Sequence, residues 1–180
     1  MIAQLSTTRL VLKPWTSTEL NALFAAHSKA EIMQALGYTT DKEYESQLKK
    51  YKDQYDLGKR PFINFQLILK DTHETIGYCG FHNWVKEHFR AEIGYHMLSD
   101  RYKQKGLMHE ALQCILHYGF DELKLHRVEA CTASDNKASI ALLHKCGFQQ
   151  EGLMRQHYYM DNLFYDSVLF SLMRDEFNTL

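Results

Sequence analysis

The sequence predicts a mixed α/β fold, in which one sheet combines antiparallel and parallel strands and carries helices on both faces. The first observation is a series of alternating apolar segments, separated by turn residues, before residue 100. The second is a strand–helix–strand–helix–strand order in the remainder of the chain. Because the chain has 180 residues, we expect one compact domain over 1–180.

The N-terminal part contains one expected strand and three expected helices. Residues 9–13 alternate and run into a proline, which predicts a short strand that ends there. A Thr-Ser-Thr-Glu capping box opens an expected helix over 16–26. Two more helices are expected over 28–37 and 41–55, and Gly58 would stop the second one.

The middle of the chain predicts a meander followed by a long helix. Strands are expected over 62–69, 75–81 and 91–97, and a hairpin turn at 71–74 joins the first two. Apolar residues then recur at helical spacing over 105–123. We therefore expect this whole segment to form one helix.

The C-terminal part predicts three strands and one helix. The strands are expected over 127–133, 148–158 and 164–173. The helix over 136–147 has a polar, capping start and a glycine at its end. We assign its buried side to Ala138, Ile140, Ala141 and either Leu142 or Leu143.

Composition narrows the class of protein. The formal net charge of -1 gives no support for direct nucleic-acid binding, and no apolar run reaches the roughly 20 residues that span a bilayer. The N-terminus lacks a basic segment followed by an apolar one, so we expect a cytoplasmic protein whose widely spaced cysteines are reduced. No His or Cys spacing is typical of a metal site, and we expect no metal.

The turn before the long helix has features that suit an anion. Gly106 lets the backbone approach a ligand, and a helix start offers unpaired amides and a positive dipole end. Lys103 and Lys105 add positive charge. These features are also common at a solvated helix start, so position within the fold has to decide between the two interpretations.

Several segments resemble the GNAT acetyltransferases, above all the Rim-type (RimJ/RimL-like) N-terminal acetyltransferases of ribosomal proteins. The run 136–148 resembles their fourth conserved segment, with an Asn, a Ser three residues later, and Lys-x-Gly-Phe into a strand. Other segments in family order are 8–12, 91–95, 103–112, 125–130 and 147–155, followed by Asp166. The resemblance covers about residues 7–174.

This resemblance implies a GNAT-like fold with about seven mostly antiparallel strands and a splayed central parallel pair. It implies acetyl-CoA as the donor, with its pantetheine arm in the splay, its pyrophosphate on the helix start, and a main-chain amide of Met97 or Leu98 on the thioester oxygen. The implied contacts are Met97, Leu98, Lys103, Gln104, Lys105, Gly106, Leu107, Met108, His109, Asn136 and Ser139. Lys103, Gln104 and Met108 depart from the usual loop pattern.

The proton acceptor is expected among carboxylates on the strands. Glu92 is the first candidate base, because it alternates away from the apolar face of 91–97 and lies beside the implied site. Asp166 and Glu151 are weaker candidates. Many relatives carry a glutamate where this chain has Cys131, for which a small buried residue is the simpler interpretation than a nucleophile.

The proton donor to the leaving thiolate is expected on the helix at 136–147. The tyrosine that many GNAT enzymes use is Leu143 here, and the resemblance to the Rim-type branch implies Ser139 instead. Ser139 would otherwise bond to its own helix backbone. Asn136 is expected to cap the helix, to bond the pantetheine arm, or both.

The implied reaction is direct acetyl transfer from acetyl-CoA to a primary amine. Deprotonating an α-amine at pH 7 costs about 1.4 kcal/mol, against about 4.6 kcal/mol for a lysine-like amine. A weak base is therefore sufficient for a protein or peptide N-terminus. Alternatives are a small amine (amino acid, polyamine or aminoglycoside) and a non-catalytic CoA-binding scaffold. Acceptor specificity is expected in 16–60 and 82–90. Aromatic residues that could line that pocket, or pack in the core, are Tyr51, Tyr55, Phe62 and Trp84. The sequence leaves a homodimer open.

Overall fold

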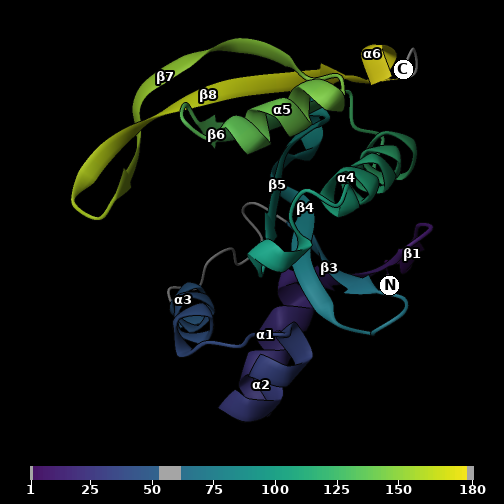
Figure 1. Cartoon of the computed structure of the whole chain (residues 1–180), viewed down its shortest axis with the longest axis vertical. Coiled ribbons are helices and arrows are strands. Elements are labelled where there is room, and N and C mark those ends of the chain that lie inside the picture. Colours follow the sequence, from purple (N-terminus) through teal and green to yellow (C-terminus); the bar gives the residue numbers. More distant parts are fainter. Residues whose placement is uncertain (1, 53–61, 178–180) are drawn as a thin grey trace.

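The computed structural model describes residues 2–52 and 62–177 and shows one mixed sheet in the order β1-β2-β3-β4-β5-β6-β8-β7 (Figure 1). The strands are β1 (Leu5–Ser6), β2 (Leu10–Thr16), β3 (Ile63–Leu69), β4 (Thr75–Val85), β5 (Arg90–Met97), β6 (Arg127–Ala133), β7 (Gln149–Met160) and β8 (Leu163–Met173). The mixed sheet and its seven expected strands are confirmed. The eighth strand, β1, is a two-residue addition at the edge, paired with β2.

Five helices follow the predicted order: α1 (Ser17–Ala26), α2 (Lys29–Leu36), α3 (Asp41–Lys52), α4 (Leu107–His117) and α5 (Lys137–Lys145). A short helix after the last strand, α6 (Arg174–Phe177), was not predicted. The side chains of Thr16 and Ser28 cap α1 and α2, each in a capping box, and Gly37 ends α2 in a left-handed conformation. The expected end of the third helix, with Tyr55 and Gly58, lies outside the described residues.

Strand β2 continues through Pro14 to Thr16, where the sequence predicted an end. Lys70 donates its amide to the Arg9 carbonyl, which fixes the alternation of the ladder between β2 and β3. Pro14 then sits at a position whose N–H would point away from β3. On that outer side β1 pairs only with Val11 and Leu12, so the missing N–H costs the sheet no hydrogen bond.

Helices cover both faces of the sheet, as predicted. One face carries the main core, in which Phe65 of β3 and Ile93 of β5 cluster with buried residues of α4 and α5 such as Leu112 and Leu143. On the other face the Gln66 side chain donates to the Ala35 carbonyl of α2 at 3.1 Å. The α1–α2 pair has a second, smaller core there, made by Leu20, Ile32 and Leu36.

Two helices differ from the prediction. The expected helix over 105–123 begins at Leu107, because Gly106 is left-handed, and its end is a π-helical turn (Tyr118–Glu122). Helix α5 buries Leu143 and half-buries Ile140, and Cys146 after its end is buried, whereas Ala138 and Ala141 are exposed. The true stripe follows the three-residue spacing from Ile140; the assignment of both alanines to the buried side was wrong.

The parallel pair opens after three residues, which is the feature that positions the site. β5 and β6 pair only from Arg90 to Glu92 and from Arg127 to Glu129. Beyond that point β5 stays paired with β4 to Met97, and β6 stays paired with β8 to Ala133. The two strands therefore part, and the splayed central pair that the sequence predicted is confirmed.

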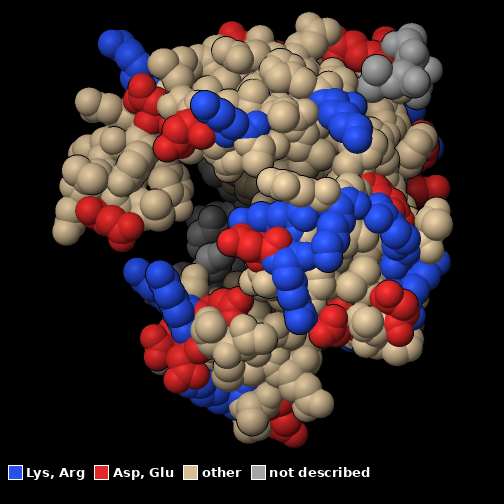
Figure 2. Space-filling model, viewed as in Figure 1, with Lys and Arg blue, Asp and Glu red and all other residues tan. Residues whose placement is uncertain are grey.

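The β7–β8 hairpin extends away from the rest of the sheet (Figure 1). Its large exposed apolar side chains are Leu153, Tyr158, Tyr159, Met160, Leu163, Phe164 and Tyr165. Figure 2 shows the surface hollowed between this hairpin and the helices α1–α3, with basic and acidic side chains interspersed around the hollow.

Candidate active site

Backbone groups of β5 face the opening between β5 and β6. The Leu98 amide donates to the Ile76 carbonyl at 2.9 Å, and Met97 lies opposite Gly77. Because hydrogen-bonded and non-hydrogen-bonded pairs alternate along an antiparallel ladder, Tyr95 and Met97 direct their N–H and C=O groups away from β4. Of the two amides named for the thioester oxygen, Met97 therefore points into the gap, whereas Leu98 is already bonded.

The turn before α4 presents free amides beside the end of β5. Gly106 is left-handed with a φ of 73° and precedes the helix without a side-chain cap. The Glu110 amide bonds to the Gly106 carbonyl at 3.0 Å, so the amides of Leu107, Met108 and His109 come before the helical ladder. Among the residues described, no backbone carbonyl accepts from those three amides. The predicted anion-binding segment is thus assembled at one helix start.

The two lysines of this turn differ in their surroundings. The Lys103 ammonium lies 2.5 Å from the Asp100 carboxylate, which offsets much of its charge. The Lys105 carbonyl accepts from Arg9 Nη1 at 3.0 Å. The backbone amides of the turn therefore remain without a counter-charge, whereas the Lys103 ammonium is paired with a carboxylate.

Arg9, in the bend between β1 and β2, braces the turn. Its Nε lies 2.6 Å from Glu110 Oε2, and its amide donates to Glu110 Oε1 at 2.7 Å. Together with the bond to the Lys105 carbonyl, these contacts fix the start of α4 on both sides of Gly106. Sequence reasoning missed this brace, although it had placed both residues in family-like segments.

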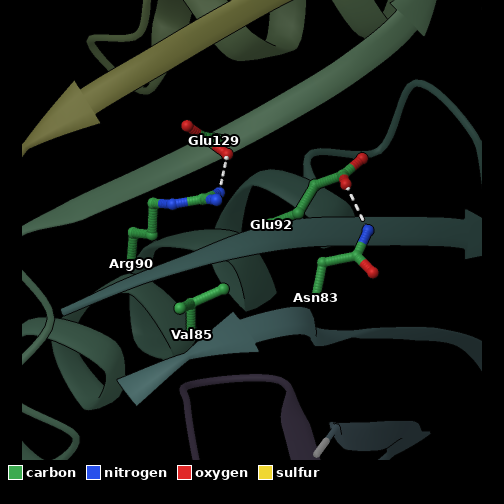
Figure 3. A pocket seen from close by; sticks show the side chains of 5 residues that line it. All are labelled: Asn83, Val85, Arg90, Glu92 and Glu129. Atoms are coloured by element: carbon green, nitrogen blue, oxygen red, sulfur yellow. Dashed lines mark hydrogen bonds and ion pairs between the residues drawn. The ribbon is translucent and has the colours of Figure 1, made fainter. Parts of the chain in front are cut away.

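Glu92 lines a cavity at the closed end of the gap (Figure 3). The cavity of about 190 Å³ is bounded by Asn83, Val85, Arg90, Glu92 and Glu129. Asn83 Nδ2 donates to Glu92 Oε2 at 2.8 Å, and His82 Nε2 lies 3.4 Å from Oε1. Burial raises the pKa of the Glu92 carboxyl, but the hydrogen bonds from His82, Asn83 and Cys131 outweigh it and leave the pKa below its usual value. Glu92 is therefore an ionised, weak base.

Two other carboxylates, Glu129 and Glu151, are held by arginines. Arg90 Nη1 donates to Glu129 Oε2 at 2.9 Å, and Arg127 Nε donates to Glu129 Oε1 at 2.8 Å. Arg127 also donates hydrogen bonds to both carboxylate oxygens of Glu151, which lowers the pKa of Glu151 to about 2. Asp166 accepts the Gln156 amide at 2.8 Å. Glu151 is thus committed to an ion pair, and Glu92 remains the first candidate base.

Ser139 meets a tyrosine that sequence reasoning did not single out. The Ser139 hydroxyl lies 2.9 Å from the Tyr95 hydroxyl, across the gap from α5 to β5. Asn136 Oδ1 accepts the Ser139 amide at 3.1 Å, so the expected cap of α5 is confirmed. Burial raises the pKa of Tyr95 to about 12. The alternating pattern of β5 could have pointed to Tyr95, because it lies on the face opposite Glu92.

Glu92 and Ser139 reach the gap from opposite faces of the sheet. Tyr95 and Ala91 of β5 lie on the side of α4 and α5, whereas Glu92 projects to the side of α1–α3. A group lodged between the strands would have a carboxylate on one side and hydroxyls on the other. This arrangement can accept a proton and donate a proton at the same bound group.

The proposed aromatic acceptor cluster is divided between the two cores. Tyr51 stacks on Phe24 with ring centroids 5.1 Å apart, and Phe62 packs on the smaller core of α1 and α2. Trp84 packs on the main core instead. Tyr55 lies outside the described residues. The described members therefore have packing roles.

The Cys131 thiol contacts the candidate base Glu92. Burial and the nearby Glu92 raise the pKa of Cys131 to about 12, so its thiol stays protonated and is no nucleophile at neutral pH. Within 2–52 and 62–177, no three His, Cys, Asp or Glu side chains gather in a way that could hold a metal ion. In the same residues no helix has the length and apolar character needed to cross a membrane.

Comparisons with known proteins agree with this geometry. Residues 9–149 match the family model described as acetyltransferase (GNAT) domain. The chain is 33% identical over 177 residues to the uncharacterized N-acetyltransferase YoaA of Bacillus subtilis (strain 168), a match that covers 97% of this chain and 98% of YoaA. It is 35% identical over 109 residues to the ribosomal protein uS5-alanine N-acetyltransferase of Escherichia coli (strain K12), covering 60% of this chain and 56% of that enzyme. The crystal structure of a GNAT-family acetyltransferase from Bacillus anthracis matches with a TM-score of 0.67 at 25% identity, covering 96% and 99% of the two chains. The chain therefore belongs to the GNAT family of acetyltransferases and is an N-acetyltransferase.

Proposed function

We propose that this protein transfers the acetyl group of acetyl-CoA to the N-terminal α-amine of a protein or peptide by direct attack. The observation that carries the proposal is the opening between β5 and β6, with Glu92 on one face and Ser139 on the other. Glu92 would accept the proton of the amine, and Ser139 would donate to the leaving sulfur. Direct attack suits this site because Cys131 stays protonated and offers no nucleophile.

The residues present fit acetyl-CoA. The amides of Leu107, Met108 and His109 suit a pyrophosphate at the start of α4, where the helix dipole adds to their attraction. The unpaired edge of β5 suits the amide groups of the pantetheine arm, which would pair with it as a short added strand. The Met97 amide would donate to the thioester oxygen, and one such donor contributes about 3 kcal/mol in comparable acyl-transfer sites.

The weakness of Glu92 as a base favours an α-amine. Its pKa is lowered, so it removes protons less readily than an ordinary carboxylate. An α-amine costs about 1.4 kcal/mol to deprotonate at pH 7, and a lysine-like amine costs about 4.6 kcal/mol. The similarity to the uS5-alanine enzyme of E. coli supports the same class of acceptor, and a ribosomal protein as substrate would place the reaction in the cytoplasm.

A small cationic amine is the second candidate acceptor, because two carboxylates line the cavity. Glu129, however, is bound by both Arg90 and Arg127, which leaves Glu92 to attract a cation. A polyamine would need several free carboxylates along its length. The charge pattern at the cavity therefore favours a substrate with one amine at its end.

The test is an acceptor panel with release of free thiol as the readout. The panel pairs each N-terminal peptide with the same peptide bearing a blocked α-amine and a free lysine, and includes single amino acids, spermidine and an aminoglycoside. We expect turnover with the free N-termini and less than about a tenth of that rate with the blocked forms. Faster turnover of a small amine would replace this proposal with the second candidate, and no turnover with any amine would contradict both.

A further inference from the structure

We propose that Tyr95 is a positioning residue that supplies, through the Ser139 hydroxyl, the proton taken by the leaving sulfur. This inference rests on the proposed function, because it concerns how Ser139 performs the role given to it there. The juxtaposition that carries it is the 2.9 Å contact between the two hydroxyls, which come from strand β5 and helix α5. The two residues are 44 positions apart in the sequence, so no local sequence pattern indicates that they form a pair.

The pair is fixed from both sides. Tyr95 belongs to the part of β5 that is paired with β4 but has parted from β6, so its ring occupies the region where the strands open. Asn136 holds the Ser139 amide in the first turn of α5. Cys79 and Cys146, both buried, lie near Tyr95 on the side of the main core. The two hydroxyls therefore meet in a defined geometry rather than on mobile side chains.

Ser139 needs such a partner for chemical reasons. An aliphatic hydroxyl is about as weak an acid as water, with a pKa of roughly 15.7, whereas a cysteine-like thiol has a pKa of about 8.5. If Ser139 alone gave its proton to the departing thiolate, it would be left as a far more basic alkoxide. The Tyr95 phenol, whose pKa burial raises to about 12, is still several orders of magnitude more acidic than the serine hydroxyl and would carry the resulting charge at lower cost.

The step balances as a relay of two protons. As the amine nitrogen bonds to the carbonyl carbon, the carbon–sulfur bond breaks and its electron pair stays on sulfur. Sulfur takes the Ser139 proton while the Ser139 oxygen takes the Tyr95 proton. The Tyr95 phenolate then regains a proton from water, and the proton lost by the nitrogen passes to Glu92 and on to water. Because burial raises the pKa of Tyr95 to about 12, its hydroxyl is protonated before each turnover at neutral pH.

The relay predicts that the two hydroxyls act as one unit. We expect Tyr95→Phe to lower kcat by about 10- to 100-fold and to leave the dissociation constant of acetyl-CoA within about twofold. The double variant Tyr95→Phe, Ser139→Ala should be no slower than Ser139→Ala alone, because either change breaks the same relay. Two independent roles would instead multiply the losses.

A change of leaving group separates proton supply from packing. The selenoester analogue of acetyl-CoA releases a selenol, which departs as its anion without protonation. We expect the difference between wild type and Tyr95→Phe to shrink to less than about threefold with this donor, whereas a purely structural defect would persist. Tyr118→Phe is the matched control, because Tyr118 is also half-buried and its ring contacts Phe65, away from the gap.

The outcomes are distinct. Absence of wild-type turnover with every amine contradicts the proposed function itself. Wild-type turnover with an unaffected Tyr95→Phe, multiplied losses in the double variant, or an equal loss with the selenoester overturns the relay alone. Thermal unfolding of Tyr95→Phe, compared with Tyr118→Phe, shows whether the fold is retained before the rates are interpreted.

Discussion

The two faces of β5 place opposite kinds of chemistry beside one gap. On the side of α1–α3, Glu92 lies in a polar cavity with Arg90 and Glu129, and its pKa is lowered by hydrogen bonds that it accepts. On the side of α4 and α5, Tyr95 meets Ser139 beside the main core, and burial raises the pKa of Tyr95. Surroundings that shift the pKa values of two titratable groups in opposite directions are typical of sites where one group accepts a proton and the other donates it.

The comparison teaches that strand alternation is enough to separate the two roles. Side chains at neighbouring positions of one strand point to opposite faces of the sheet. The Glu92 carboxylate and the Tyr95 phenol are three positions apart, so they lie on opposite faces and do not contact each other. Each face then receives its own covering elements and its own dielectric surroundings. Variants that disturb one face should therefore leave the kinetic signature of the other face intact.

The largest expected effect is that of Glu92→Gln. We expect kcat/KM to fall by about 100-fold near pH 6.5 and by less than about tenfold near pH 9, because an amine that is already neutral needs no base. The measurement is a pH profile of thiol release with an N-terminal peptide. Glu122→Gln, at the exposed end of the π-helical turn after α4, is the control and should match wild type at every pH. A loss that is constant across pH would contradict the role of Glu92.

Ser139→Ala should have the next largest effect, on the other face. We expect kcat to fall by about 10- to 100-fold, with acetyl-CoA affinity changed by less than about threefold, because the hydroxyl is proposed to serve the leaving group rather than binding. Calorimetric titration gives the affinity and thiol release gives kcat. Ala141→Ser, which adds a hydroxyl on an exposed position of the same helix, is the control. Unchanged kcat would remove Ser139 from the mechanism.

Arg9→Met tests binding rather than chemistry and should have a smaller effect. Loss of the contacts to Glu110 and to the Lys105 carbonyl loosens the start of α4, so we expect KM for acetyl-CoA to rise by about 3- to 10-fold with kcat within about twofold. Initial rates at varied acetyl-CoA provide both constants. Lys124→Met, an exposed change in the turn before β6, should leave both unaltered. A fall in kcat with constant KM would argue against a brace for the cofactor loop.

Most of the fold was predictable because its signals are local. The capping boxes at Thr16 and Ser28 and the left-handed Gly37 act within a few residues, and they fixed α1 and α2. The passage of β2 through Pro14 was not predictable in this way, since it depends on which side of the strand lacks a partner. The buried side of α5 was likewise decided by what packs on it.

The candidate site likewise contains residues that local sequence patterns predicted and contacts that they could not predict. Alternation and family resemblance pointed to Glu92, Gly106 and Ser139, each within a recognisable segment. The contacts of Arg9 with Glu110 join residues 101 positions apart, and no local pattern encodes such a pair. Strand alternation already places Glu92 and Tyr95 on opposite faces of the sheet. The contact between Tyr95 and Ser139, however, depends on the position of α5 over the gap, which the sequence does not give.

The smallest expected effect concerns stability on the Glu92 face, away from the proposed proton transfers. Glu151 has a pKa of about 2 in the folded protein because Arg127 and Ser171 donate to it, against its ordinary value of 4.5. A lowered pKa stabilises the fold fully above the ordinary value, and the contribution is lost as pH falls towards 2. Glu151→Gln should therefore lower the free energy of unfolding at pH 7 by about 1–2 kcal/mol, a figure reduced for the partial exposure of Glu151. Urea unfolding at several pH values should show the two proteins converging between pH 5 and 2, with kcat at pH 7 unchanged. A constant difference down to pH 2 would mean that Glu151 acts through packing, and a fall in kcat would return it to the list of candidate bases.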